Sequence, residues 1–61
     1  MVDFFWVKAL ALRSLGKMLA LAGKAADARV VFEDALRIYD DKGDASSVAR
    51  MRDLLATVAP N

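Results

Sequence analysis

The sequence contains neither cysteine nor histidine among its 61 residues. Without cysteine there are no disulfides and no thiolate chemistry, and without histidine there is no imidazole to bind zinc or move protons. The acidic residues occur singly or in pairs, not as the alternating oxygen ligands of a calcium loop, and no glycine-rich phosphate loop is present. We therefore expect no metal, no cofactor and no catalytic residue, and hence no enzyme. The missing cysteine agrees with a cytoplasmic protein without requiring one.

Neither sign of charge is in large excess, because the formal net charge is +1. This balance, with no cluster of basic residues on one predicted helix, argues against a nucleic-acid partner. The distribution is uneven, however. Residues 1–26 contain four basic residues and one acidic residue, whereas residues 27–61 contain five basic and seven acidic residues. The sequence thus predicts a basic end and an acidic end.

The chain also lacks the uninterrupted run of about 20 apolar residues that a membrane-spanning helix needs. Its apolar N-terminal stretch is interrupted by Lys8, Arg13 and Lys17. A signal peptide would carry positive charge before a short apolar region, but Asp3 occupies that place. We interpret residues 3–22 as part of the fold.

Strong helix breakers are few, and they occur at Gly23, Gly43 and Pro60. They divide the chain into three segments, each with the apolar periodicity of a helix. Because the links between segments are short, consecutive helices should be antiparallel neighbours. The sequence predicts one all-α module over residues 1–61, with helices at about 3–22, 25–42 and 45–59.

The second and third segments each have one apolar face with helical spacing. In the second these residues are Ala28, Val31, Phe32, Ala35, Ile38 and Tyr39, and in the third Val48, Met51, Leu54, Leu55 and Val58. The opposite side of the second segment carries charges of alternating sign every four residues, at Arg29, Glu33, Arg37 and Asp41. Such a ladder keeps a helix face in water.

Three residues have the chemistry of helix ends. Asp3 and Asp44 are predicted N-caps, because a carboxylate accepts hydrogen bonds from the free N–H groups of a first turn. Gly43 is predicted to adopt the left-handed conformation that ends the second helix.

The first and second segments share a pattern of small and large residues. It comprises Leu15-Gly16, Gly23 at the turn, Ala28 and Phe32 four residues apart, Ala35-Leu36 and Ile38. Residues 9–42 thereby resemble a tetratricopeptide repeat (TPR), a 34-residue helix–turn–helix unit. Gly16, Ala28 and Ala35 are small where two helices cross closely. Leu15 and Phe32 are large where a gap must be filled.

Departures from the TPR pattern point to a longer form of the repeat. Leu12 and Leu19 stand at the family's Trp and Tyr positions, and Asp40 replaces the closing Pro, so the second helix can continue. This resembles the roughly forty-residue repeats of kinesin light chain and of bacterial regulators with repeat tails. The resemblance implies a TPR-like antiparallel helical hairpin, with the third helix beginning a second repeat and capping the first.

The resemblance also implies a function in protein binding. A repeat cannot bury its hydrophobic face alone, and the first helix is apolar over most of its circumference. We expect a protein–protein interaction or assembly module, either self-associating through this helix as a homo-oligomer or belonging to a larger repeat array. The predicted hydrophobic interface comprises Phe4, Phe5, Trp6, Val7 and Leu10.

A second candidate surface also follows from the TPR resemblance. TPR proteins bind partner segments in a concave groove lined by their first helices. The positions that correspond to it here are Arg13, Lys17, Leu21 and Arg50. A solvated basic face is the alternative interpretation of these charges.

One alternative belongs to another class of function. The first helix has a Trp, two Phe and no acidic residue between Phe4 and Ala26, so a cationic amphipathic helix on an anionic membrane surface is conceivable. Its basic residues do not gather on one face, however, and the Leu15-Gly16 pattern accounts better for its apolar breadth.

Overall fold

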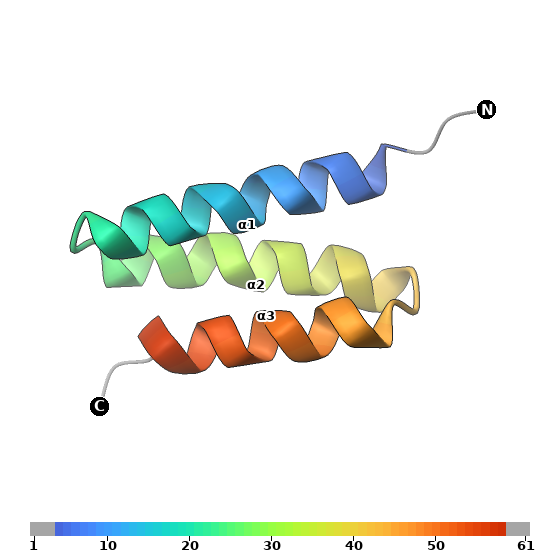
Figure 1. The fold of residues 1–61 in the computed structure, drawn as a ribbon. Helices are drawn as coiled ribbons and strands as arrows, with labels where there is room; N and C mark the ends of the chain where they lie inside the picture. The colour runs from blue at the N-terminus through green and yellow to red at the C-terminus, as the bar shows by residue number, and fades with distance from the viewer. Residues whose placement is uncertain (1–3, 59–61) are drawn as a thin grey trace.

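The computed structural model describes residues 4–58, which form three α-helices (Figure 1). Helix α1 spans Phe5–Leu21, α2 spans Ala25–Asp41 and α3 spans Ala45–Val58. No strand occurs among the described residues, so the predicted all-α class is confirmed. The predicted N-cap Asp3 and the predicted helix end at residue 59 lie outside residues 4–58.

The three helices run antiparallel and side by side, with α2 in the middle (Figure 1). Helices α1 and α3 both pack against α2, and they contact each other only weakly. The molecule is consequently elongated and thin, with extents of 40 × 18 × 13 Å. Each outer helix therefore has one side against α2, and much of the rest of its surface is exposed.

Both turns close in the same way, through a glycine with positive φ. Gly23 has φ 79° and Gly43 has φ 73°. The next N–H donates back across each turn, from Lys24 to the Leu19 carbonyl at 2.8 Å and from Asp44 to the Tyr39 carbonyl at 3.0 Å. This is the Schellman arrangement that satisfies free carbonyls at a helix end. The predicted left-handed role of Gly43 is confirmed.

Asp44 caps α3, as the sequence predicts. The Ser47 N–H donates to Asp44 Oδ1 at 3.2 Å, and the Ser47 hydroxyl donates to Oδ2 at 2.8 Å. These bonds satisfy a donor in the first turn of the helix and hold the chain at the α2–α3 turn.

Removal of this cap should cost measurable stability. We expect Asp44→Ala to lower the free energy of unfolding by about 1 kcal/mol, whereas Asp44→Asn, which keeps the acceptor, should lose much less. Urea denaturation followed by circular dichroism measures both. Equal stability of the two variants would mean that the cap bonds contribute nothing.

The core is a narrow strip along α2. Its buried hydrophobic residues are Ala9, Ala28, Phe32, Ala35, Tyr39, Met51 and Val58. The remaining predicted core residues of α2 and α3 are half-buried around them, at Val31, Ile38, Val48, Leu54 and Leu55. The apolar faces predicted for the second and third segments are therefore confirmed.

Small residues sit where α1 and α2 meet. Gly16 is buried, and a Cβ added to it would lie 2.6 Å from Phe32 Cδ1 and 2.9 Å from Phe32 Cζ. The Phe32 ring thus fills the space that a side chain at position 16 would take. The predicted pairing of a small residue at 16 with a large one at 32 is confirmed.

The charged face of α2 is realised in part as predicted. Arg29 pairs with Glu33 at 3.7 Å, four residues along the helix. Arg37 pairs with Asp34 at 3.3 Å, three residues away, instead of joining the predicted four-residue ladder. Both pairs are exposed, so each contributes only a few tenths of a kcal/mol.

Candidate functional site: two exposed faces of α1

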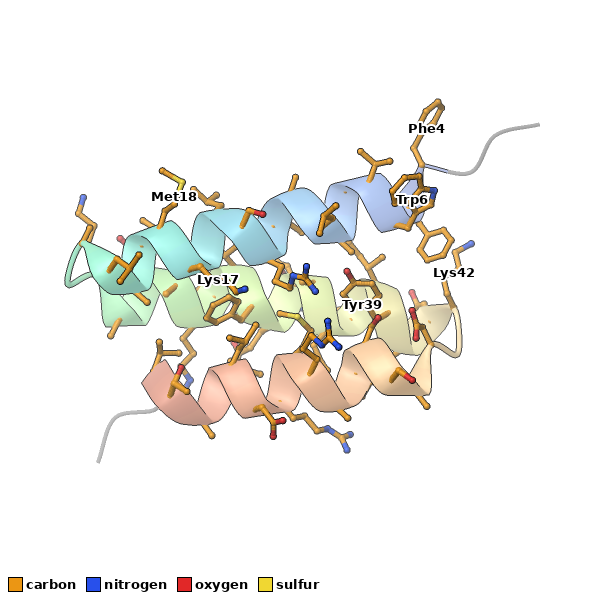
Figure 2. The ribbon with its side chains drawn as sticks, viewed as in Figure 1. Phe4, Trp6, Lys17, Met18, Tyr39 and Lys42 are labelled. Atoms are coloured by element: carbon orange, nitrogen blue, oxygen red, sulfur yellow. The ribbon has the colours of Figure 1, made fainter. Side chains whose placement is uncertain are left out.

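One face of α1 is apolar along its length and touches nothing else in the molecule. We name it the outer stripe, and it consists of Phe4, Val7, Ala11, Leu15 and Met18. Their spacing of three and four residues puts them on one side of a helix. All five are exposed, and Phe4 and Met18 are each 67% exposed. Figure 2 shows both of these side chains extending from α1 away from α2.

The outer stripe carries no charge of its own. On the helix, Lys8 is the charged residue that lies next to it, since Arg13 and Lys17 fall on the far side at 100° per residue. Small soluble proteins rarely leave a contiguous apolar strip of this kind in water, and such strips mark interaction surfaces. The outer stripe is the principal candidate site.

A second exposed face of α1, which we name the groove side, contains Trp6, Leu10, Arg13, Lys17 and Leu21. Lys17 and Leu21 line a shallow cavity of about 320 Å³, together with Ala20, Phe32, Leu54 and Thr57. The cavity lies between α1 and α3 and has the Phe32 ring of α2 at its base. Figure 2 places Lys17 over the boundary between α1 and α2.

The structure brings the four predicted groove residues to this region to different degrees. Lys17 and Leu21 line the cavity directly, and Leu21 is 89% exposed. Arg13 precedes Lys17 by four residues, and Arg50 precedes the cavity residue Leu54 by four. Each is therefore one turn along the same side of its helix. The groove is thus flanked by basic residues from both α1 and α3.

The predicted hydrophobic interface does not form a single surface. Phe4 and Val7 belong to the outer stripe, whereas Trp6 and Leu10 lie on the groove side. Phe5 faces the bundle, where it is half-buried with the Lys42 ammonium 4.9 Å from its ring centroid. A Lys at this distance makes a cation–π contact that ties the start of α1 to the end of α2.

The sequence interpretation missed two residues of the outer stripe, Leu15 and Met18. Leu15 was expected to fill a gap beside Gly16, but it is 46% exposed and points away from α2. Phe32 alone fills that gap. The usable signal was the spacing of Phe4, Leu15 and Met18, which share one side of the helix, but periodicity did not say whether that side was inside or outside.

The largest cavity lies elsewhere, between the start of α2 and the end of α3, with a volume of about 500 Å³. Exposed Arg29 and Glu33, which pair with each other, form part of its wall. Within residues 4–58 no three acidic side chains converge in the way a metal site requires.

Comparison of the chain with family models, with curated proteins and with solved structures found no match. Among the helices of residues 4–58, none has both the length and the apolar character needed to cross a membrane. The argument for function therefore rests on the two faces of α1.

Proposed function

We propose that this chain is a TPR-like protein–protein interaction or assembly module of the cytoplasm, and that it docks through α1. The observation that carries the proposal is the outer stripe, an apolar face as long as the helix with no internal neighbour. Covering half-exposed side chains of this size contributes roughly 1 kcal/mol or more for each large residue. Part of that gain offsets the freedom lost on association, and the remainder favours binding.

Features of the helical hairpin support the TPR-like part of the proposal. Gly16 and Phe32 interlock at the α1–α2 crossing, and Ala28 and Ala35 are fully buried along α2. Helix α3 packs on the other side of α2, which suits a capping helix. In this interpretation the outer stripe is the side that a neighbouring helix covers, and the groove side binds a peptide segment or partner helix.

In-cell photo-crosslinking tests the proposal directly. A photoreactive phenylalanine analogue is introduced at Leu15, and irradiated adducts are identified by mass spectrometry. The same analogue at Asp53, an exposed position on α3, serves as the control. We expect Leu15 to give discrete protein adducts, with this chain itself or with another protein, that Asp53 does not give. No adducts beyond those of the control would refute a docking role for α1.

A membrane-surface role is the alternative, and one feature favours it. Lys8 lies beside the outer stripe, and α1 contains no acidic residue. Flotation with anionic vesicles separates the two functions. Flotation of the wild-type chain that Leu15→Glu abolishes would favour the membrane, whereas absence of the chain from the floating fraction removes this alternative.

A further inference from the structure

The outer stripe has a symmetry that the proposed function does not require. Its five residues are separated by intervals of three, four, four and three, so the spacing reads the same in both directions from Ala11. We propose that the outer stripe binds the outer stripe of a second copy, with the two α1 helices antiparallel about a two-fold axis at Ala11. This inference rests on the proposed docking role of α1 and names its partner.

A two-fold axis at Ala11 pairs every residue of the stripe with a suitable neighbour. Phe4 meets Met18 of the partner subunit, Val7 meets the partner's Leu15, and Ala11 meets the partner's Ala11. The smallest residue thus sits at the centre, where it lets the two helices approach closely, and larger residues fill the flanks. A Met sulfur against an aromatic ring is a favourable contact at either end.

The distribution of charge favours the antiparallel pairing over a parallel one. In a parallel pair the two Lys8 ammonium groups would lie side by side along the seam. In the antiparallel pair they are six residues apart along the helices, about 9 Å, in addition to the separation of the axes. At that distance ionic screening removes most of their repulsion. Antiparallel helices also place opposite ends of the helix dipoles together.

The symmetric spacing distinguishes a second copy from other occupants of the outer stripe. In a two-fold interface the same patch occurs on both partners, so the patch must be complementary to itself. A preceding helix of a repeat array, or a lipid surface, needs an apolar strip but not a palindromic one. The intervals of the outer stripe are thus explained by self-pairing and by neither alternative.

The size of the stripe predicts how tight the dimer is. From Phe4 to Met18 the stripe spans 14 residues, or about 21 Å along a helix roughly 10 Å wide. This corresponds to the lower end of specific protein interfaces. We therefore expect a dissociation constant in the micromolar range, with monomer and dimer exchanging on dilution.

Engineered disulfides test the register, because the natural chain has no cysteine. With helix axes about 8–10 Å apart, the two Cα atoms at position 11 lie roughly 3.5–5.5 Å apart, which overlaps the range a disulfide spans. Mild oxidation of Ala11→Cys should therefore give a covalent dimer in high yield. Met18→Cys is the matched control, because its two sulfur atoms would lie about 21 Å apart.

Light scattering over a range of concentrations supplies the second measurement. Leu15→Glu buries two unpaired charges in the dimer and should weaken association roughly 100-fold or more. Trp6→Ala, which removes a larger apolar side chain from the groove side, should change the dissociation constant by less than about threefold. Both positions are exposed in the monomer, so helicity should be retained.

The outcomes separate this inference from the proposed function. Cross-linking of Met18→Cys as readily as Ala11→Cys, or dissociation caused by Trp6→Ala and not by Leu15→Glu, would overturn the antiparallel dimer. A chain that stays monomeric at millimolar concentration would overturn it too. In that case adducts from Leu15 with another protein would still support the docking role, and their absence would remove both.

Discussion

Replacement of Phe32 by alanine is expected to unfold the domain. Phe32 is 1% exposed and is one of the two largest fully buried side chains, so its ring touches both outer helices through the core. Truncation of a buried aromatic side chain costs about 3–5 kcal/mol. A domain of this length, with no disulfide or metal, has no more than about 3–5 kcal/mol of stability to lose.

The measurement is thermal and urea unfolding of Phe32→Ala at a fixed low concentration, since dimerisation would add stability. Val30→Ala is the matched control, because Val30 lies on the same helix but is largely exposed. It should change the free energy of unfolding by less than about 0.5 kcal/mol. A cooperative, wild-type transition for Phe32→Ala would mean that the core lies elsewhere.

Gly16→Ala is expected to destabilise the fold, although the same change in an open helix stabilises it. A glycine inside a helix costs about 1 kcal/mol relative to alanine. Here the added methyl would come within 3.0 Å of the Phe32 ring, which is buried on all sides and has no room to move. Overpacking of a core costs about 1–3 kcal/mol, so we expect a net loss of stability.

A double-mutant cycle with Phe32→Leu attributes that loss to the ring. In the Phe32→Leu background the methyl at position 16 enters space that the ring has vacated, and Gly16→Ala should become neutral or stabilising. The coupling free energy between the two positions should be about 1 kcal/mol or more. Equal effects of Gly16→Ala in both backgrounds would show that the ring is not the cause.

Most of the local structure was predictable from the sequence. Gly23 and Gly43 end helices because glycine adopts positive φ at little cost, and Asp44 begins one because its carboxylate accepts hydrogen bonds from the next turn. The core face of α2 was predictable because that helix is charged on one side and apolar on the other. Phe32 and Tyr39 were therefore assigned to the core correctly.

The candidate site was predictable only in part. The apolar breadth of α1 indicated an uncovered face, and Phe4 and Val7 were correctly assigned to exposed positions. Phe5 was grouped with them because it is adjacent in sequence, but one residue along a helix is a rotation of about 100°. Leu15 was assigned to the core because it precedes Gly16, and the same rotation takes it outward.

The sequence by itself determined three helices, their ends and the inward face of α2, because these depend on local backbone chemistry and on one-sided amphipathic patterns. Only the tertiary structure decided which apolar residues of α1 face water. An all-round apolar helix has no preferred rotation of its own. Its orientation is set by the one place where α2 comes closest, at the contact of Gly16 with Phe32. That contact turns Leu15 and Met18 outward and so creates the outer stripe.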